Sequence, residues 1–372
     1  QLYGDELMLS ASQVDKQALC RFGYFMRYGL KAKERKPLSV DPAEFGTYVH
    51  AVLEQTVREV MEKGGFAEVS LETTLEISRK HAEDYASQHF NQLQSERMAY
   101  LFRRNGQELE LVVRELWDEL RNSEFVPVGF EVEFSDSGEV GAIQIPGHRI
   151  GAHLRGFVDR VDVWQDRGID YFRVVDYKTG KKDFDYCDIY NGLGLQMLLY
   201  LFALEDDGKV ILGEHPRAAG VQYFPARVEY IPVDGVQDEN AIIELRAKQW
   251  KRKGLLLQDM DVLRAMDPDP ASKRLCCSEK RDGTLSGDIA DAAQFKLLRA
   301  YVFTLLGRIV DEIASGEVTP NPYTRGSSDN ACRFCPYSPV CHPESVEGRR
   351  NFKTVTAQRF WEDVAKEVNT HG

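Results

Sequence analysis

The stretch from Leu154 to Gly180, LRGFVDRVDVWQDRGIDYFRVVDYKTG, determines the predicted fold. Residues 154–164 and 171–177 are rich in Val, Phe and Tyr, which is typical of β-strands. The segment 165–170 between them has the polar and glycine residues of a turn. Two strands joined by so short a connection should pair antiparallel, so we predict a hairpin here.

The predicted hairpin carries two carboxylates and a lysine. Asp159 stands among apolar residues of the first strand, and pairing with the second strand brings it close to Asp176. Side chains two apart in a strand face the same side, so Lys178 should point with Asp176. Two neighbouring carboxylates repel unless a cation lies between them or one is protonated, and such oxygen ligands suit Mg²⁺ or Mn²⁺. The set predicts metal-assisted phosphodiester hydrolysis, in which the lysine orients or deprotonates the attacking water.

An Asp-x-Lys triplet also has a plainer interpretation, because most such residues at a strand end are solvated surface. The apolar setting of Asp159 favours the metal site, since a carboxylate between apolar residues needs a partner. Asp162 is the competing carboxylate on the same strand. It falls on the opposite face of a regular strand, so it cannot serve one metal together with Asp159.

Two polar residues elsewhere are candidates for the same metal. His50 lies in a helix predicted from Pro42 to about Glu62. It is either a third metal ligand or an ordinary helix histidine with a hydrogen-bond partner. Glu131, on the predicted strand 129–134, is a weaker candidate for the metal shell.

The apolar segment 193–204, LGLQMLLYLFAL, is too long and too rich in leucine for a strand and is predicted to be a buried helix. Gln196 and Tyr200 are four residues apart, so they share one face of it. They are either polar residues on a partly buried helix, or groups that contact a DNA backbone or brace Lys178.

Three cysteines near the C-terminus have the spacing C-x₂-C-x₅-C, at Cys332, Cys335 and Cys341. Three close cysteines in a proline-rich loop predict a metal site, and spacing alone does not choose between zinc and an iron–sulfur cluster. The total of seven cysteines is odd, which argues against a secreted disulfide framework and for a reducing compartment. The candidates for a fourth ligand are Cys20, Cys187, Cys276, Cys277 and His342.

The whole chain is predicted to run from helix to sheet and back to helix. Residues 1–125 are mainly helical, 126–235 hold the strands of the catalytic core, and 236–372 are helical with a cysteine-rich loop. This order predicts an α/β fold, with a small mixed sheet flanked by helices, in a single domain over 1–372. The other expected elements are helices at 10–30, 72–122 (one or two), 237–257, 288–315 and after 354, and strands at 219–225 and 228–231.

The composition is that of a soluble globular protein, and its acidic balance argues against a histone-like protein that binds nucleic acid non-specifically. Lys and Arg number 47 against 59 Asp and Glu, which gives a net charge of −12. Basic residues nevertheless cluster at 31–36, 178–182 and 248–253, which predicts a narrow basic path towards an acidic metal site. The chain begins at Gln1, shows no signal peptide and lacks a G-x₄-G-K-[ST] motif. We therefore expect a cytoplasmic segment of a longer protein, without an ATP site of its own.

These motifs together resemble the nuclease domain of AddB-type helicase–nuclease subunits, in the RecB-like branch of the PD-(D/E)XK nucleases. The resemblance covers nearly the whole chain. Its segments are 10–30, 45–50 (FGTYVH), 156–162 (GFVDRVD), 175–180 (VDYKTG), 196–200 (QMLLY) and 331–341, with 253–257, 265–267 and 316–323.

The resemblance implies a PD-(D/E)XK nuclease core with a helical N-terminal region and a C-terminal cysteine clasp. It implies a nuclease site formed by His50, Asp159, Asp176 and Lys178, with Mg²⁺ on the first three and with Gln196 and Tyr200 beside the DNA strand. It also implies a [4Fe–4S] cluster on Cys20, Cys332, Cys335 and Cys341. The family usually has proline after the first of these cysteines, whereas Arg21 stands here.

The implied function is that of a metal-dependent exonuclease on single-stranded DNA ends. It would process double-strand breaks for recombinational repair, with DNA fed by an ATP-dependent helicase partner. The alternatives are a free-standing RecB-like or Cas4-like exonuclease and a DNA-binding scaffold module whose nuclease site is idle. The intact Asp-x-Lys set favours an active enzyme, and the resemblance after Lys253 favours the helicase-associated form.

Overall fold

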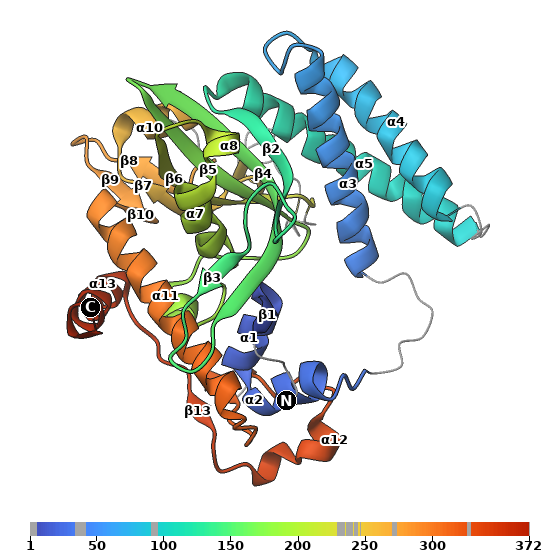
Figure 1. Ribbon diagram of the computed structural model, residues 1–372. Helices are drawn as coiled ribbons and strands as arrows, with labels where there is room; N and C mark the ends of the chain where they lie inside the picture. The colour runs from blue at the N-terminus through green and yellow to red at the C-terminus, as the bar shows by residue number, and fades with distance from the viewer. Residues whose placement is uncertain are drawn as a thin grey trace.

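The fold is built on one mixed sheet with helices around it, as Figure 1 shows for the computed structural model. The structure describes residues 6–33, 42–90, 96–228, 247–269, 274–325 and 329–371, together with residues 235, 241 and 245. The helices are α1 (Ala11–Leu19), α2 (Arg21–Tyr24), α3 (Pro42–Glu62), α4 (Leu71–Phe90), α5 (Glu96–Asn122), α6 (Tyr186–Tyr190), α7 (Gln196–Asp207), α8 (Lys209–Leu212), α10 (Met260–Met266), α11 (Ala292–Ser315), α12 (Ser338–Cys341) and α13 (Ala357–His371). The strands are β1 (Leu7–Ser10), β2 (Val126–Phe134), β3 (Ile143–Ile145), β4 (Ala152–Asp166), β5 (Ile169–Lys178), β6 (Pro216–Pro225), β7 (Lys253–Leu257), β8 (Cys277–Glu279), β9 (Leu285–Gly287), β10 (Ile289–Ala290), β11 (Tyr323–Arg325), β12 (Asp329–Asn330) and β13 (Arg350–Asn351).

The predicted hairpin is confirmed and forms the centre of the sheet. β4 and β5 pair antiparallel up to Asp166 opposite Ile169. The two residues between them, Arg167 and Gly168, have φ of 48° and 80°, the positive values that a tight two-residue hairpin turn requires. The sheet order is β1-β4-β5-β6-β7-β10, and β2 and β3 also pair with β4. Parallel and antiparallel pairs occur together, so the prediction of an α/β fold with a mixed sheet flanked by helices is confirmed.

Helices cover both faces of this sheet and enclose two hydrophobic cores (Figure 1). Val174 belongs to the core that includes α7 and α11, and Val175 to the core that includes α3, α4 and α5. Neighbouring strand residues point to opposite faces, so the two cores lie on opposite sides of β5.

α7 confirms the predicted buried helix, since every residue from Met197 to Leu204 is buried. A helix that is apolar all round is one enclosed on all sides. Among the described residues, no helix is long and apolar enough to cross a membrane.

The helix predicted over 10–30 is interrupted at Cys20. α1 ends at Leu19, Cys20 has an extended backbone (φ −170°, ψ 119°), and α2 and a π-helical turn follow it. The prediction also missed β1, whose last residue, Ser10, caps α1 with a capping box. Helical apolar spacing continues across the break, which is why the sequence did not reveal it.

The helix predicted over 237–257 is wrong at its C-terminal end. Residues 253–257 form β7, which pairs antiparallel with β6. A short leucine run that is buried on both faces of a sheet has the same pattern as a buried helix. Parts of some predictions lie outside the described residues: most of 229–246, and with it most of the strand expected at 228–231, and residues 34–36 of the first basic cluster. The predictions at 42–62, 72–122 (two helices), 219–225 and after 354 are confirmed. The helix predicted over 288–315 begins later, at Ala292, because residues 289–290 form β10 and pair with β7.

Candidate active site and cysteine site

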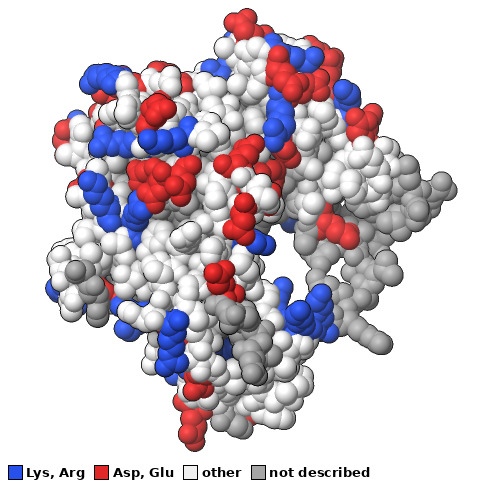
Figure 2. All heavy atoms as spheres, viewed as in Figure 1, with Lys and Arg blue, Asp and Glu red and all other residues white. Residues whose placement is uncertain are grey.

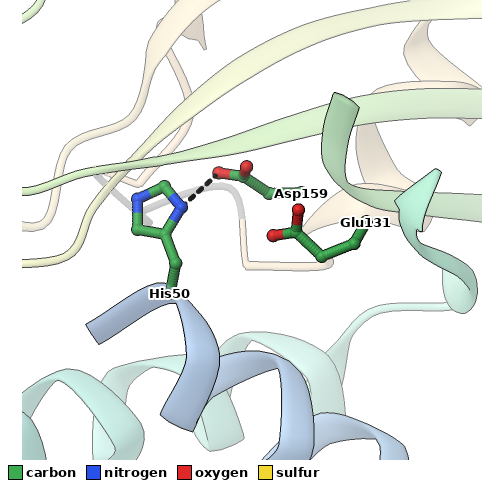
Figure 3. Close-up of side chains that lie close together, drawn as sticks. All are labelled: His50, Glu131 and Asp159. Atoms are coloured by element: carbon green, nitrogen blue, oxygen red, sulfur yellow. Dashed lines mark ion pairs between the residues drawn. The ribbon is translucent and has the colours of Figure 1, made fainter. Parts of the chain in front are cut away.

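Three side chains from separate elements converge at the side of the sheet (Figure 3). His50 comes from α3, Glu131 from β2 and Asp159 from β4, and one possible ligand atom from each lies within 4.8 Å of the others. His50 Nδ1 is 3.4 Å from Asp159 Oδ2. A histidine nitrogen and two carboxylates at this spacing fit a divalent cation such as Mg²⁺ or Mn²⁺.

The pairing of β2 with β4 explains why Glu131 meets Asp159. Phe130 pairs with Arg160 and Val132 with Val158, so Glu131 lies between these pairs and across from Asp159. Its φ is +47°, a left-handed backbone that a residue with a long side chain seldom adopts. Such strain is typical of sites where the surrounding structure fixes a side chain for a function. The sequence suggested Glu131 only weakly because regular alternation along a strand does not reveal this local turn.

Asp176 and Lys178 stand beside this group at the end of β5. Asp176 is buried, and its carboxylate forms an ion pair with the Lys178 ammonium. The backbone N–H of Tyr177, between them, donates a hydrogen bond of 2.6 Å to Asp159 Oδ2. Asp159 is therefore held by the same strand end that carries the Asp-x-Lys triplet.

The pKa values of Asp176, Glu131 and His50 are all raised. Burial and the nearby Asp159 raise the pKa of Asp176 to about 6. Burial, Asp159 and Glu54 raise the pKa of Glu131 to about 7. Burial alone would lower the pKa of His50, but its hydrogen bond to Asp159 and the charges of Asp159 and Asp176 raise it. A bound cation would relieve the repulsion that causes these shifts, so the donor set fits a metal.

Gln196 and Tyr200 come from α7, which covers the face of β5 that carries Val174 and Asp176. Burial, together with the charges of Asp176 and Asp159, raises the pKa of the Tyr200 hydroxyl. The Tyr200 ring is buried and stacks on Phe134 at 4.8 Å between ring centroids. Its hydroxyl is hydrogen-bonded with the Gln196 side chain and with the backbone of Phe157. A Cβ on Gly156 would lie 1.7 Å from that hydroxyl, so only glycine fits there. Tyr200 thus supports β4 three residues before Asp159, and this geometry accounts for the glycine of the GFVD sequence.

A buried ionic network beneath β4 and β5 was missed by the sequence predictions. Arg160 and Arg173 both bind Asp162, with Nε–Oδ distances of 2.8 Å, and Arg173 Nη2 donates to Glu119 of α5 at 3.0 Å. Although burial opposes it, the surrounding arginines hold the pKa of Glu119 well below its usual range. Asp162 therefore binds these arginines and does not join Asp159, as predicted from its position on the opposite face of the strand.

The network also reaches the end of β5, next to the candidate active site. Arg160 Nη1 donates a hydrogen bond of 3.0 Å to the Tyr177 hydroxyl, on the opposite strand face from Asp176 and Lys178. Arg252 contributes a further pair to Glu119, with Nε 2.9 Å from Oε2. The signal in the sequence was a pair of arginines at positions 160 and 173 among the valines and phenylalanines of two core strands.

The cysteine site brings together residues from both ends of the chain. One small cavity is lined by Cys20, Cys332, Cys335 and Cys341. Burial raises the pKa of the Cys341 thiol, and the other three thiols raise it further. The other three cysteines do not line this cavity: Cys187 contacts Val355, Cys276 contacts Asp288, and Cys277 begins β8. His342 follows Cys341, but its side chain is exposed and is not part of the cavity lining. Four thiols around one cavity fit a zinc ion or an iron–sulfur cluster.

Comparison with known proteins gives a consistent result. The sequence model of the PD-(D/E)XK nuclease superfamily matches residues 8–342. The chain is 33% identical, over 98% of its length, to the B subunit of the ATP-dependent helicase/deoxyribonuclease of Acetivibrio thermocellus and likewise to that of Clostridium novyi. It is 36% identical, over 91% of its length, to the corresponding protein of Moorella thermoacetica. The matches cover 33%, 33% and 30% of those proteins, so the chain spans about a third of the length of these relatives.

Proposed function

We propose, since the chain belongs to the PD-(D/E)XK nuclease superfamily, that it is the nuclease part of a helicase–nuclease complex and hydrolyses DNA with a divalent metal. The observation that carries this proposal is the convergence of His50, Glu131 and Asp159 beside the Asp176–Lys178 pair. The names of the similar helicase/deoxyribonuclease proteins support the DNA substrate and the helicase partner.

The metal would be held by His50, Asp159 and Asp176, and the position of Glu131 supports it as a further ligand. Bound there, Mg²⁺ would supply a Lewis acid for the phosphate and lower the pKa of a coordinated water. Asp159 is positioned for its role by the Tyr177 N–H, and His50 is oriented by Asp159.

Lys178 is the residue of this site that would act on the water and the phosphate. Its ammonium is partly exposed while its ion-pair partner Asp176 is buried, so the charged group sits at the mouth of the site. From there it can orient the attacking water and offset charge that develops on the phosphate. Gln196 and Tyr200 would contribute indirectly, by holding the β4 backbone near Asp159.

The cysteine site would hold a [4Fe–4S] cluster on Cys20, Cys332, Cys335 and Cys341. The first two ligands are 332 − 20 = 312 positions apart in sequence. By analogy with a disulfide that closes a long loop, such a clasp would stabilise the fold by roughly 4–5 kcal/mol. The cluster would therefore serve the structure of the domain, and a cytoplasmic, reducing location would preserve its thiolates.

The fuller form of the proposal is an exonuclease that acts on single-stranded DNA ends during double-strand break processing and recombinational repair. A translocating partner would feed the strand to this site. The net charge of −12 supports this division of labour, because a nuclease with delivered DNA needs less binding of its own.

The test is a cleavage assay on end-labelled single-stranded DNA with Mg²⁺. Asp176→Ala and Lys178→Ala should each lower the rate by at least about 100-fold, since each removes a group that acts in the transition state. The chain offers a matched control, the triplet Asp207-Gly208-Lys209 with its two exposed charged residues, in which Asp207→Ala and Lys209→Ala should leave the rate unchanged. Full activity in Lys178→Ala would overturn the assignment of the site, and binding without any cleavage by the wild type would favour an idle scaffold module.

A further inference from the structure

We infer that a basic cleft next to the candidate active site holds the sugar–phosphate backbone of the DNA strand that is cut. This inference rests on the proposed nuclease function and adds a binding surface to it. The cleft has a volume of about 660 Å³ and lies between the turn after β5, the end of β6 and the segment before β7. Its basic residues are Lys178, Lys181, Lys182, Arg227, Lys248, Lys251 and Lys253.

The charge of this cleft is opposite to that of the chain. Its described lining includes the seven basic residues above and one carboxylate, Asp183, which pairs with Lys253 at 3.0 Å. Elsewhere acidic and basic side chains are interspersed, as the face in Figure 2 shows. A local excess of positive charge on a chain of net charge −12 needs an anionic ligand to explain it, and a phosphodiester backbone is a regular row of anions.

Lys178 connects the cleft with the reacting groups. The same ammonium that pairs with Asp176 also lines the cleft. A strand that lies in the cleft would therefore place one of its phosphates beside the metal-binding carboxylates. A metal site of this kind acts on phosphodiesters, which an acidic polypeptide does not contain. We therefore infer a nucleic-acid strand as the ligand.

A buried aromatic ring sets the positions of two of these charges. The Tyr223 ring forms the floor of the cleft and is 6% exposed. Lys178 Nζ lies 5.9 Å and Lys182 Nζ 6.0 Å from its centroid, within the range of a cation–π contact. The two ammonium groups are thus held by the core of the protein, and do not depend on the conformation of a surface loop alone.

The chemistry of the lining also indicates how the strand is recognised. Lysine and arginine contacts to phosphates position a nucleic acid without reading its sequence. A positively charged groove that follows the backbone, with an aromatic ring beside it, is the arrangement by which proteins bind single strands without sequence preference. We therefore expect single-stranded DNA to bind here without sequence preference.

The test measures binding of a fluorescent single-stranded oligonucleotide to the 372-residue chain in EDTA, at several salt concentrations. Lys248→Gln/Lys251→Gln removes two charges from the wall of the cleft farthest in sequence from the catalytic triplet. Its control, Lys80→Gln/Lys209→Gln, removes two charges from exposed lysines on α4 and α8, outside the cleft lining. Thermal unfolding of both variants checks that each is folded.

The cleft variant should bind more weakly, and the slope of log K against log salt should fall by about 1.4, because each phosphate contact on a single strand contributes about 0.7. The control should match the wild type in affinity and slope. With Mg²⁺ present, the cleft variant should show a raised KM with kcat nearly unchanged, as expected when only uniform binding is lost.

Equal affinities and slopes for the cleft variant and its control would overturn the inference, whether or not the protein cuts DNA. So would displacement of the oligonucleotide by polyglutamate as effectively as by unlabelled DNA. If the cleft variant loses binding while the wild type cuts nothing in Mg²⁺, the cleft stands and the proposed nuclease function fails. The two failures are therefore distinguishable.

Discussion

Glu131 and Asp176 bring two raised pKa values, about 7 and about 6, to the same small site. Metal binding needs both carboxylates deprotonated, so below these pKa values a metal must displace protons. We expect the apparent affinity for Mn²⁺ or Mg²⁺ to rise with pH between about 5 and 8, with proton release on binding. Titration calorimetry in two buffers of different ionisation enthalpy measures that release.

Asp176→Asn is the control for this prediction, because it removes one titrating ligand. It should reduce both the affinity and the number of protons released at pH 6. An affinity that stays constant across this pH range would contradict the assignment of the carboxylates as ligands.

The close contact between Gly156 and Tyr200 gives a second prediction at the residue scale. Gly156→Ala would place a methyl group 1.7 Å from the Tyr200 hydroxyl, so the helix or the strand must shift. Overpacking of this kind typically costs about 1–3 kcal/mol in the free energy of unfolding. Chemical denaturation measures the loss. Because the clash involves the hydroxyl and also the ring carbon that carries it, at 2.6 Å, Tyr200→Leu should cost less stability in the Gly156→Ala background than in the wild type, and additive effects would contradict this contact.

Among single residues, those in short motifs were predictable and those placed by tertiary structure were not. Asp159, Asp176 and Lys178 could be grouped because strand alternation and hairpin pairing fix their neighbours. Glu119 could not, because in sequence it is one more acid on a charged amphipathic helix, and only packing shows that it is buried among arginines.

At the scale of elements, this network joins helix α5 to strands β4 and β5. Arg173 is almost fully buried and binds both Asp162 and Glu119. Arg173→Met would leave buried carboxylates with fewer partners, and breaking a buried pair from one side typically costs about 3–5 kcal/mol. Urea denaturation should show this loss, whereas Arg264→Met, which removes an exposed pair with Glu279, should cost less than about 1 kcal/mol. Similar losses in the two variants would contradict a structural role for the network.

The elements themselves were largely predictable where their periodicity is strong. α3, α5 and α11 have long helical patterns, and the β4–β5 hairpin has apolar strands around a polar turn. β7 was assigned to a helix because a run of leucines buried on two faces has no period to distinguish it. The break at Cys20 was also invisible, since helical apolar spacing continues across it.

At the scale of the whole molecule, the cysteine site connects α1 with the loop around α12. Cys20→Ser should abolish iron binding and lower the melting temperature, because it removes the one ligand from the N-terminal part of the chain. Iron content and absorption near 400 nm on anaerobically prepared protein measure the first effect, and thermal unfolding the second. Cys187→Ser, which changes a half-buried thiol outside the site, is the matched control. Zinc in place of iron would replace the cluster proposal with a zinc site, and iron retained by Cys20→Ser would contradict the ligand assignment.

The meeting of Cys20 with the loop around Cys335 also affects how the protein would respond to a protease. A cut between Cys20 and β4 would leave two fragments that stay paired through β1 and β4 of the sheet, and a cluster bound by all four cysteines would join them as well. Such nicked protein would migrate as one species in a native gel and separate into two only after the cluster is removed and the fold is denatured. Limited digestion would then map the exposed loops of the domain while the domain itself stays in one piece.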